Sequence, residues 1–237
     1  MRGRMRGRMR MGGVAHVGGV YRRSTRKVHG RAAASANANQ VLRPCPRGLV
    51  HLPITAMRCI SLITTGGTIE KTYDEQSGRL ENRRSIVHRM LRRLRLEDTV
   101  VSAIELLSKD SLDMTAADRQ AIVDVTRAAI ANPENVGVVI LHGTDTLCLT
   151  GDALVRELPA PRVPVVLTGA MRPFEMVRSD ALQNLTEALF AVDVVAPGVY
   201  VTAHGRALKF PGVSKDRERG TFVRVSADGT PPQPGAR

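Results

Sequence analysis

Five short apolar runs, separated by segments with helical periodicity, limit most strongly what this chain can fold into. The runs are rich in β-branched residues, and they cover residues 58–64, 99–107, 136–143, 163–169 and 197–204. Near-continuous hydrophobicity of this kind is typical of strands that are buried on both faces of a parallel sheet. The alternation therefore predicts an α/β fold, a parallel sheet flanked by helices of the Rossmann or flavodoxin-like kind.

The segments between the runs predict the helices that cover the sheet. These segments span residues 83–96, 115–131, 146–158 and 177–195. In the first, Ile86, Met90 and Leu94 form an apolar stripe at i, i+4 and i+8. In the second, Thr115 and Asp118 have the spacing of a capping box, which predicts the helix start.

The net charge of +13 is concentrated in the N-terminal segment. Residues 1–57 contain 12 Arg and Lys and no acidic residue, whereas the rest of the chain has 23 basic and 22 acidic residues. Without a basic excess on the folded part, we expect no nucleic-acid partner. We divide the chain into a disordered basic leader (1–57), one α/β domain (58–225) and a flexible Pro/Gly-rich tail (226–237).

The leader begins with the Arg/Gly/Met repeat MRGRMRGRMRMGG, which has no hydrophobic periodicity. Three hypotheses account for it: a transit peptide, a nucleic-acid-binding arm, or upstream DNA translated from a misassigned start codon. We favour the third, because 30 Arg against 5 Lys suggests a GC-rich genome. In that case the native chain begins at Met57.

The three cysteines, Cys45, Cys59 and Cys148, are widely spaced and form neither a CxxC pair nor a Cys/His cluster. This pattern argues against a disulfide framework and a zinc site, and it favours a reducing compartment. No stretch reaches the roughly 18 to 20 apolar residues of a membrane span. We therefore expect a cytoplasmic protein that binds no metal and no membrane.

Hydroxyl-rich loops follow several of the predicted strands. TTGGT (64–68) follows the first strand and HGTDT (142–146) follows the third. Ligands of open α/β sheets bind beyond the carboxyl ends of the strands, so these loops are where chemistry is expected. The phosphate-binding patterns GxGxxG and GxxxxGK[ST] are both absent, which disfavours a nucleotide site.

The loops and the stretch 204–222 supply Thr hydroxyls, an aspartate and a lysine. A threonine is a weak nucleophile that needs a neighbouring base, and a lysine held by an aspartate can take the proton. The stretch 204–222 contains two lysines, Lys209 and Lys215. Thr144 and Thr146 could in addition cap the following helix.

Four stretches together resemble the bacterial-type L-asparaginases of the asparaginase/glutaminase family. They are TTGGTIEKTY (64–73), KDSLDMT (109–115), HGTDT (142–146) and VVLTGAMRP (165–173), in the family's order. The resemblance implies hydrolysis of L-asparagine to L-aspartate and ammonia through a threonine acyl-enzyme, without a cofactor.

The same resemblance implies roles for particular residues. Thr68 matches the nucleophile, and Tyr73 matches a lid tyrosine that helps to activate it. Thr144, Asp145 and Lys215 match a Thr-Lys-Asp arrangement, in which Asp145 also contacts the α-amino group of the substrate.

Four further residues are implied to bind substrate: Ser111, at its α-carboxylate, with Gly67, Gly143 and Leu112. Leu112 stands where some family members have a polar residue that contacts the substrate. The choice among asparagine, glutamine and a larger amide therefore stays open.

Family members usually carry a second, smaller C-terminal domain that builds a dimer interface and lends an acidic residue to the neighbouring site. This chain ends near the point where that domain would begin, so we expect a short form, and at least a dimer through the α/β domain. Two alternatives remain: a component of a tRNA-linked amidotransferase, and a non-catalytic amino-acid-binding remnant.

Overall fold

The computed structural model describes residues 57–225. The predictions for the leader, apart from Met57, and for the tail concern residues outside this part, so the division into domains stays a prediction. The strands are β1 (Arg58–Gly66), β2 (Thr72–Asp74), β3 (Arg79–Glu81), β4 (Thr99–Lys109), β5 (Asn135–Leu141), β6 (Pro164–Thr168), β7 (Gly198–Ala203), β8 (Arg206–Lys209), β9 (Val213–Asp216) and β10 (Thr221–Arg224). The helices are α1 (Val87–Leu91), α2 (Ala116–Ala131), α3 (Leu147–Glu157) and α4 (Ala181–Val194), with short 3-10 turns η1 (Thr68–Glu70) and η2 (Ser111–Asp113).

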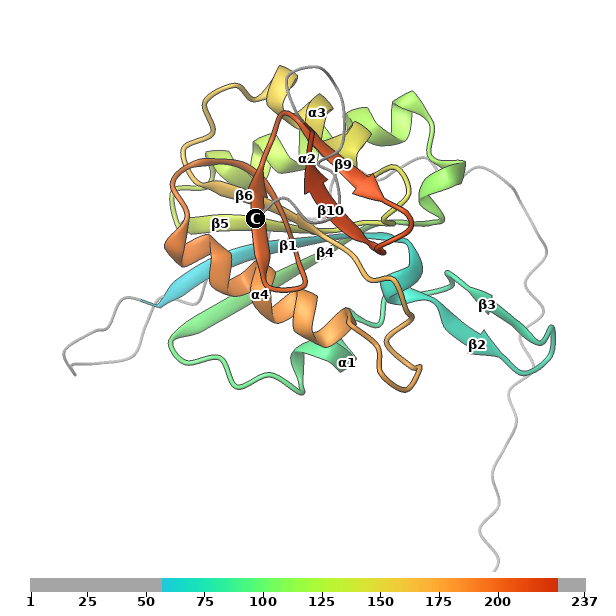
Figure 1. The fold of residues 1–237 in the computed structure, drawn as a ribbon. Coiled ribbons are helices and arrows are strands. Elements are labelled where there is room, and N and C mark those ends of the chain that lie inside the picture. The colour runs from blue at the N-terminus through green and yellow to red at the C-terminus, as the bar shows by residue number, and fades with distance from the viewer. Residues whose placement is uncertain (1–56, 226–237) are drawn as a thin grey trace, which may run out of the picture. The chain divides into compact units, whose positions relative to one another are not determined.

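Six strands form one sheet in the order β4-β1-β5-β6-β7-β8 within the described residues (Figure 1). The first five are parallel, and β8 runs antiparallel to β7. Numbered along the chain, the parallel strands have the order 2-1-3-4-5, which is the flavodoxin-like arrangement. The predicted fold class is therefore confirmed.

Helices cover both faces of the sheet, as the buried strands require. One apolar core lies between the sheet and helices α2 and α3, and the other lies between the sheet and helices α1 and α4 (Figure 1). Alternate residues of β5 serve the two cores, with Ile140 in the first and Val139 and Leu141 in the second. This division explains why the sequence of β5 is apolar at almost every position.

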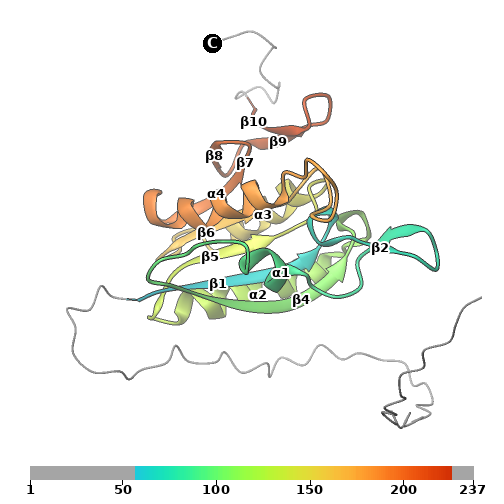
Figure 2. The ribbon, with the colours of Figure 1, turned by 90° about the horizontal axis from the view of Figure 1, so that it is seen from below.

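Two small hairpins lie outside the sheet. The pair β2–β3 projects from the carboxyl end of β1 in both views, and the pair β9–β10 lies beyond the β7–β8 edge (Figure 2). The chain reaches β8 through a tight turn at His204 and Gly205, both of which have positive φ. That turn adds the antiparallel strand that the sequence pattern did not predict.

Two predictions about individual elements were wrong. The helix expected at 83–96 is only α1, because the chain turns after Leu91 and reverses into β4 through Asp98, whose φ is +48°. Strand β4 is half-buried and not fully buried, because it forms an edge of the sheet. By contrast, the capping box of Thr115 and Asp118 at the start of α2 is present in both directions.

Cys148, on α3, is a free, half-buried thiol. Between residues 57 and 225, no helix is long and apolar enough to cross a membrane.

Candidate active site

Three of the candidate catalytic residues lie at the carboxyl ends of β1 and β5, which are neighbours in the sheet. Thr68 follows β1 directly, while Thr144 and Asp145 follow β5. The chain winds to opposite sides of the sheet from these two strands, and ligands of such folds bind beyond the strand ends at this point. The location agrees with the expectation drawn from the sequence.

Glycines allow the loops that follow β1, β4 and β5 to approach one another closely. Gly66 and Gly67 have φ of 93° and 78°, a backbone region that side chains disfavour. A Cβ on Gly67 would overlap the backbone of Gly143, and a Cβ on Gly143 would lie 2.6 Å from Ser111 Oγ. Because the backbones touch, the loops that carry Thr68, Ser111 and Thr144 are held in one place.

The side chains of Thr144, Asp145 and Lys215 meet as the resemblance implied. The ammonium of Lys215, on β9, donates hydrogen bonds to Thr144 Oγ1 at 2.8 Å and to Asp145 Oδ1 at 3.0 Å. The Thr144 residue is only 4% exposed, so the pair is shielded from water on the threonine side. Shielding of this kind strengthens charged hydrogen bonds.

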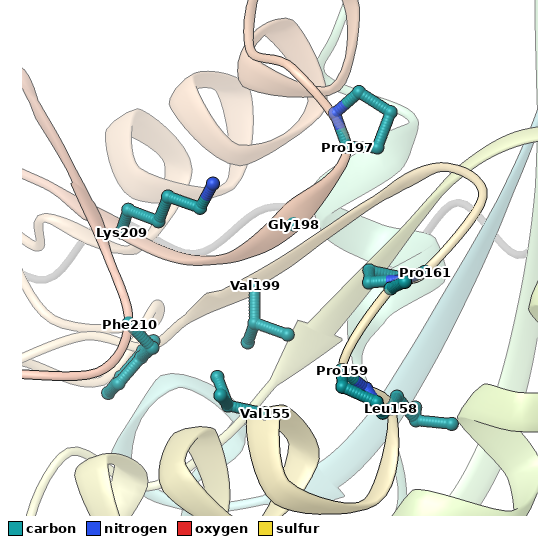
Figure 3. A pocket seen from close by; sticks show the side chains of 10 residues that line it. Val155, Leu158, Pro159, Pro161, Pro197, Gly198, Val199, Lys209 and Phe210 are labelled. Atoms are coloured by element: carbon teal, nitrogen blue, oxygen red, sulfur yellow. The ribbon is translucent and has the colours of Figure 1, made fainter.

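The alternative lysine, Lys209, lies elsewhere. Its ammonium is 5.9 Å from the centre of the Tyr200 ring, and its side chain lines a cavity of about 320 Å³ beside Phe210 and Val155 (Figure 3). It therefore makes no contact with Thr144, and Lys215 is the lysine of the arrangement.

Asp145 has a second cationic partner that the sequence analysis missed. The guanidinium of Arg217 lies 2.9 Å from Asp145 Oδ1, the same oxygen that Lys215 contacts. The side chain of Arg217 is 70% exposed, so solvent screens this ion pair. The spacing of two from Lys215 was the available signal, because alternate residues near a strand share a face.

Ser111 has a buried hydroxyl that makes no hydrogen bond within residues 57–225. A buried polar atom without a partner costs free energy, which a ligand could recover. Next to it, Leu112 is 66% exposed, and its side chain supplies no polar group. Thr146, which we expected to cap α3, instead donates its hydroxyl to the Ser111 carbonyl oxygen at 2.8 Å.

Thr68 and Tyr73 make no hydrogen bond to each other within the described residues. Thr68 begins η1, half-buried, and its hydroxyl has no hydrogen-bond partner among the described residues. Tyr73 is 59% exposed on β2, where a Cβ on Gly78 would lie 3.9 Å from its hydroxyl. Tyr73 N donates to Glu175 Oε2 at 3.1 Å, so a loop of the main domain holds the base of this hairpin.

Two buried titratable groups lie directly beside these loops. Burial lowers the pKa of His142 to about 4, and its ring donates from Nδ1 to Gly143 O and accepts at Nε2 from Thr150, both at 2.8 Å. His142 is thus a neutral group with structural hydrogen bonds on both ring nitrogens. Burial raises the pKa of Glu70 to about 7, although Gly66 N donates to it at 3.0 Å and Ser85 Oγ also donates.

Within the described residues, no group of three His, Cys, Asp or Glu side chains could hold a metal ion.

The model of the domain "Asparaginase, N-terminal" matches residues 59–222. The chain belongs to the asparaginase family. It is 33% identical to an L-asparaginase of Thermococcus kodakarensis over 65% of this chain and 46% of that protein. It is 31% identical to a glutamyl-tRNA(Gln) amidotransferase subunit of Methanococcus maripaludis over 63% of this chain and 35% of that protein. The chain thus spans less than half the length of these curated relatives.

Solved asparaginase structures share the fold. The thermostable L-asparaginase of T. kodakarensis superposes with a TM-score of 0.64 at 29% identity, over 70% of this chain and 51% of that one. A Campylobacter jejuni protein named "Probable Cytoplasmic L-asparaginase" gives 0.61 at 26% identity, over 72% of this chain and 54% of that one. Both agree with the sheet described above.

The two buried titratable groups predict a specific pH dependence of stability. The folded protein keeps the Glu70 proton up to pH about 7, whereas the unfolded chain loses it near 4.5, so this group makes unfolding easier as pH rises. His142 stays neutral in the folded protein down to pH about 4, whereas the unfolded chain binds a proton near 6.5, so this group makes unfolding easier as pH falls. The two effects oppose each other between pH 4.5 and 6.5.

Replacing Glu70 by Gln should therefore expose the His142 effect. We expect the free energy of unfolding of Glu70→Gln, from urea titrations, to rise by about 2 to 3 kcal/mol between pH 4.5 and 6.5, while that of the native chain changes by less than about 1 kcal/mol. Glu81→Gln, in the β2–β3 hairpin, should behave like the native chain. A flat profile for Glu70→Gln would contradict the assignment.

Proposed function

We propose that this chain hydrolyses L-asparagine to L-aspartate and ammonia through an acyl-enzyme on Thr68, without a cofactor. The observation that carries the proposal is the contact of Lys215 with both Thr144 and Asp145, next to the glycine-bounded loop of Thr68. Membership of the asparaginase family and the L-asparaginase relatives support it. Its setting would be asparagine catabolism.

The first step is attack of Thr68 Oγ on the carbon of the side-chain amide. The hydroxyl proton passes to a base, a role that we assign to Tyr73. Because the hydroxyl of Tyr73 lies by its own hairpin turn, this role requires the β2–β3 hairpin to move toward Thr68. The amide C–N bond then breaks, and the nitrogen takes up a proton and leaves as ammonia.

The second step is hydrolysis of the acyl ester. Water adds to the ester carbon, and Thr144 Oγ, which the Lys215 ammonium holds by a hydrogen bond, relays the proton of this water. The acyl–oxygen bond breaks, and the proton returns to Thr68 Oγ. Asp145 holds Lys215 on Thr144 in both steps, and electrostatic stabilisation of the developing oxyanion should be the largest rate term, a few kcal/mol per donor.

Substrate recognition in this proposal uses groups around the same loops. The unpartnered hydroxyl of Ser111 binds the α-carboxylate, and the free oxygen of Asp145 binds the α-ammonium. Gly67 and Gly143 allow the substrate to approach the backbone. Leu112 offers the substrate no polar group, so glutamine and a larger amide are the alternative substrates.

A role as the amidase component of a tRNA-linked amidotransferase is the second candidate, because a protein named as part of such an enzyme is among the relatives. We favour the small-molecule amide, since the domain from residue 58 onward has no basic excess for tRNA. We further propose a cytoplasmic protein that forms at least a homodimer. A monomer in light scattering would contradict the dimer.

Removing the Thr68 hydroxyl tests the nucleophile. We expect Thr68→Ala to lower ammonia release from L-asparagine by at least about a thousandfold, because the variant lacks the oxygen that forms the acyl ester. Thr186→Ala, an exposed threonine on α4, should retain native activity. An active Thr68→Ala would refute the proposed nucleophile, and a native protein that binds L-aspartate but releases no ammonia would favour the non-catalytic remnant.

Removing Arg217 tests recognition of the α-ammonium. Since Arg217 competes for the carboxylate of Asp145, Arg217→Ala should lower KM for L-asparagine about two- to fivefold, as expected for a solvent-exposed pair. KM for succinamate, which lacks the α-amino group, should stay unchanged in Arg217→Ala. In the control Arg219→Ala, KM for L-asparagine and KM for succinamate should both stay at their native values. A rise of both KM values in Arg217→Ala would mean that Arg217 binds the substrate carboxylate instead.

A further inference from the structure

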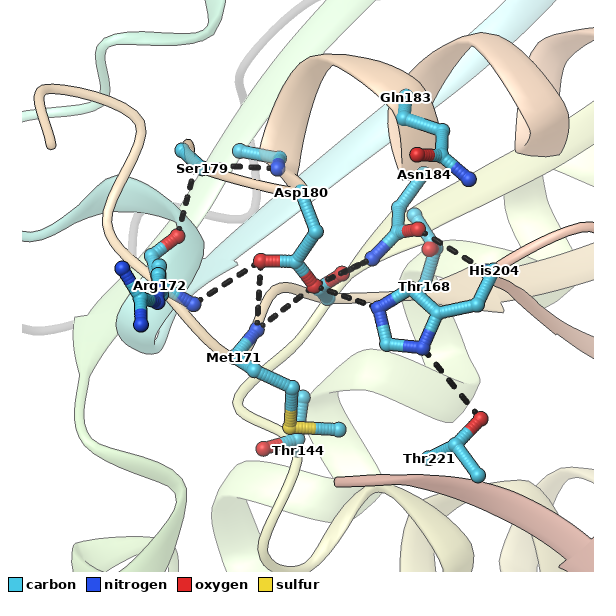
Figure 4. A network of polar contacts seen from close by, with 12 residues as sticks. Thr144, Thr168, Met171, Arg172, Ser179, Asp180, Gln183, Asn184, His204 and Thr221 are labelled. Atoms are coloured by element: carbon cyan, nitrogen blue, oxygen red, sulfur yellow. Dashed lines mark hydrogen bonds and ion pairs between the residues drawn. The ribbon is translucent and has the colours of Figure 1, made fainter. Parts of the chain in front are cut away.

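The carboxylate of Asp180 collects hydrogen bonds from three separate parts of the chain (Figure 4). It accepts from the backbone N–H groups of Met171, at 2.9 Å, and Arg172, at 3.0 Å. It also accepts from Asn184 Nδ2 and His204 Nε2, both at 2.9 Å. The mechanism above does not use any of these side chains.

Helix capping does not explain this carboxylate. Asp180 occupies the N-cap position of α4, where an aspartate normally accepts a hydrogen bond from the first turn of its helix. Its side chain makes no such bond. It is turned instead toward the loop that follows β6. Helix α4 therefore lacks a side-chain cap from Asp180, which would stabilise the protein by about 1 kcal/mol.

The loop that Asp180 holds forms a wall beside Thr144. A Cβ on Gly169 would lie 3.0 Å from Thr144 Cγ2 and would overlap the His142 carbonyl oxygen. Asn184 Nδ2 donates to the Gly169 carbonyl oxygen at 2.8 Å, from the same helix. Displacement of this loop would therefore move the side chain of Thr144.

His204 extends the network to the hairpin that carries Lys215. Its backbone N–H donates to Asn184 Oδ1 at 3.1 Å, and its ring Nδ1 lies 3.4 Å from Thr221 Oγ1 (Figure 4). Thr221 begins β10, and the next residue, Phe222, pairs with Lys215 in β9. The imidazole thus bridges Asp180 and the strand that positions Lys215.

We propose that Asp180 and His204 are positioning residues that fix the distance between Thr144 and Lys215 from both sides. Asp180 holds the wall beside Thr144, and His204 holds the β9–β10 hairpin at the end of β7. Neither residue touches the substrate. The kinetic consequence of this inference rests on the proposed function, whereas its geometric consequence does not.

The charge of Asp180 is maintained by its donors. Burial alone would raise the pKa of its carboxyl group, but the N–H groups of Met171, His204 and Arg172 bring the pKa below its ordinary value. An amide at this position would present one oxygen acceptor, where the carboxylate presents two. Asp180→Asn therefore removes part of the network at nearly constant volume.

The kinetic test compares Asp180→Asn and His204→Ala with a matched control, Glu187→Gln. Glu187 Oε1 accepts from Gly205 N at 2.8 Å, so the control disturbs the same turn without touching Asp180. We expect kcat for L-asparagine to fall about tenfold or more in both variants, with KM within about twofold, because Ser111 and the glycines lie on other loops. The control should keep the native kcat. His204→Gln retains a side-chain N–H donor, so it should recover part of the kcat that His204→Ala loses.

A structural measurement tests the same inference without activity. In crystal structures of Asp180→Asn and His204→Ala, the distance from Lys215 Nζ to Thr144 Oγ1 should lengthen from 2.8 Å to beyond about 3.5 Å. An unchanged distance in both variants, or an equal fall of kcat in the control, would overturn the inference. A native protein that releases no ammonia would overturn the proposed function instead, and the distance would still decide the positioning role.

Discussion

The backbones of Gly67 and Gly143 touch where β1 and β5 end, and the candidate site depends on this contact. Any side chain at Gly67 would push the two loops apart, and a Cβ at Gly143 would collide with Ser111. With two glycines, the loop of Thr68 and the loop of Thr144 sit side by side at the point where the strand order reverses. Strand β9 then brings Lys215 to Thr144, the contact on which the proposed chemistry rests.

Much of the fold follows from the order of its apolar segments. The five parallel strands could be predicted because each contains a run rich in apolar, β-branched residues, and α2 could be placed because Thr115 and Asp118 satisfy the cap in both directions. Edges and turns could not be predicted in this way. Strand β8 exists because His204 and Gly205 adopt positive φ, and no hydrophobic pattern encodes that turn.

The candidate site likewise contains some residues that the sequence pattern indicates and others that it does not. The position of Thr144 and Asp145 directly after a predicted strand indicated their role from the sequence, and the family resemblance pointed to Lys215 over Lys209. Asp180 and His204 could not be found from the sequence, because their bond joins distant segments that share no periodic pattern. For Arg217 the signal in the sequence was its spacing of two from Lys215. Tyr73 lies on the β2–β3 hairpin and makes no hydrogen bond to Thr68 within the described residues, so its proposed role as a base requires this hairpin to move.

The most direct test of the account is to locate the acyl group. The native protein would be mixed with L-asparagine, quenched in acid within milliseconds, digested, and its peptides examined by mass spectrometry for an aspartyl ester. The account predicts the ester on Thr68, in the peptide that follows β1. An ester on Thr144 would contradict it, because the Thr144–Lys215 pair would then supply the nucleophile and not the proton path.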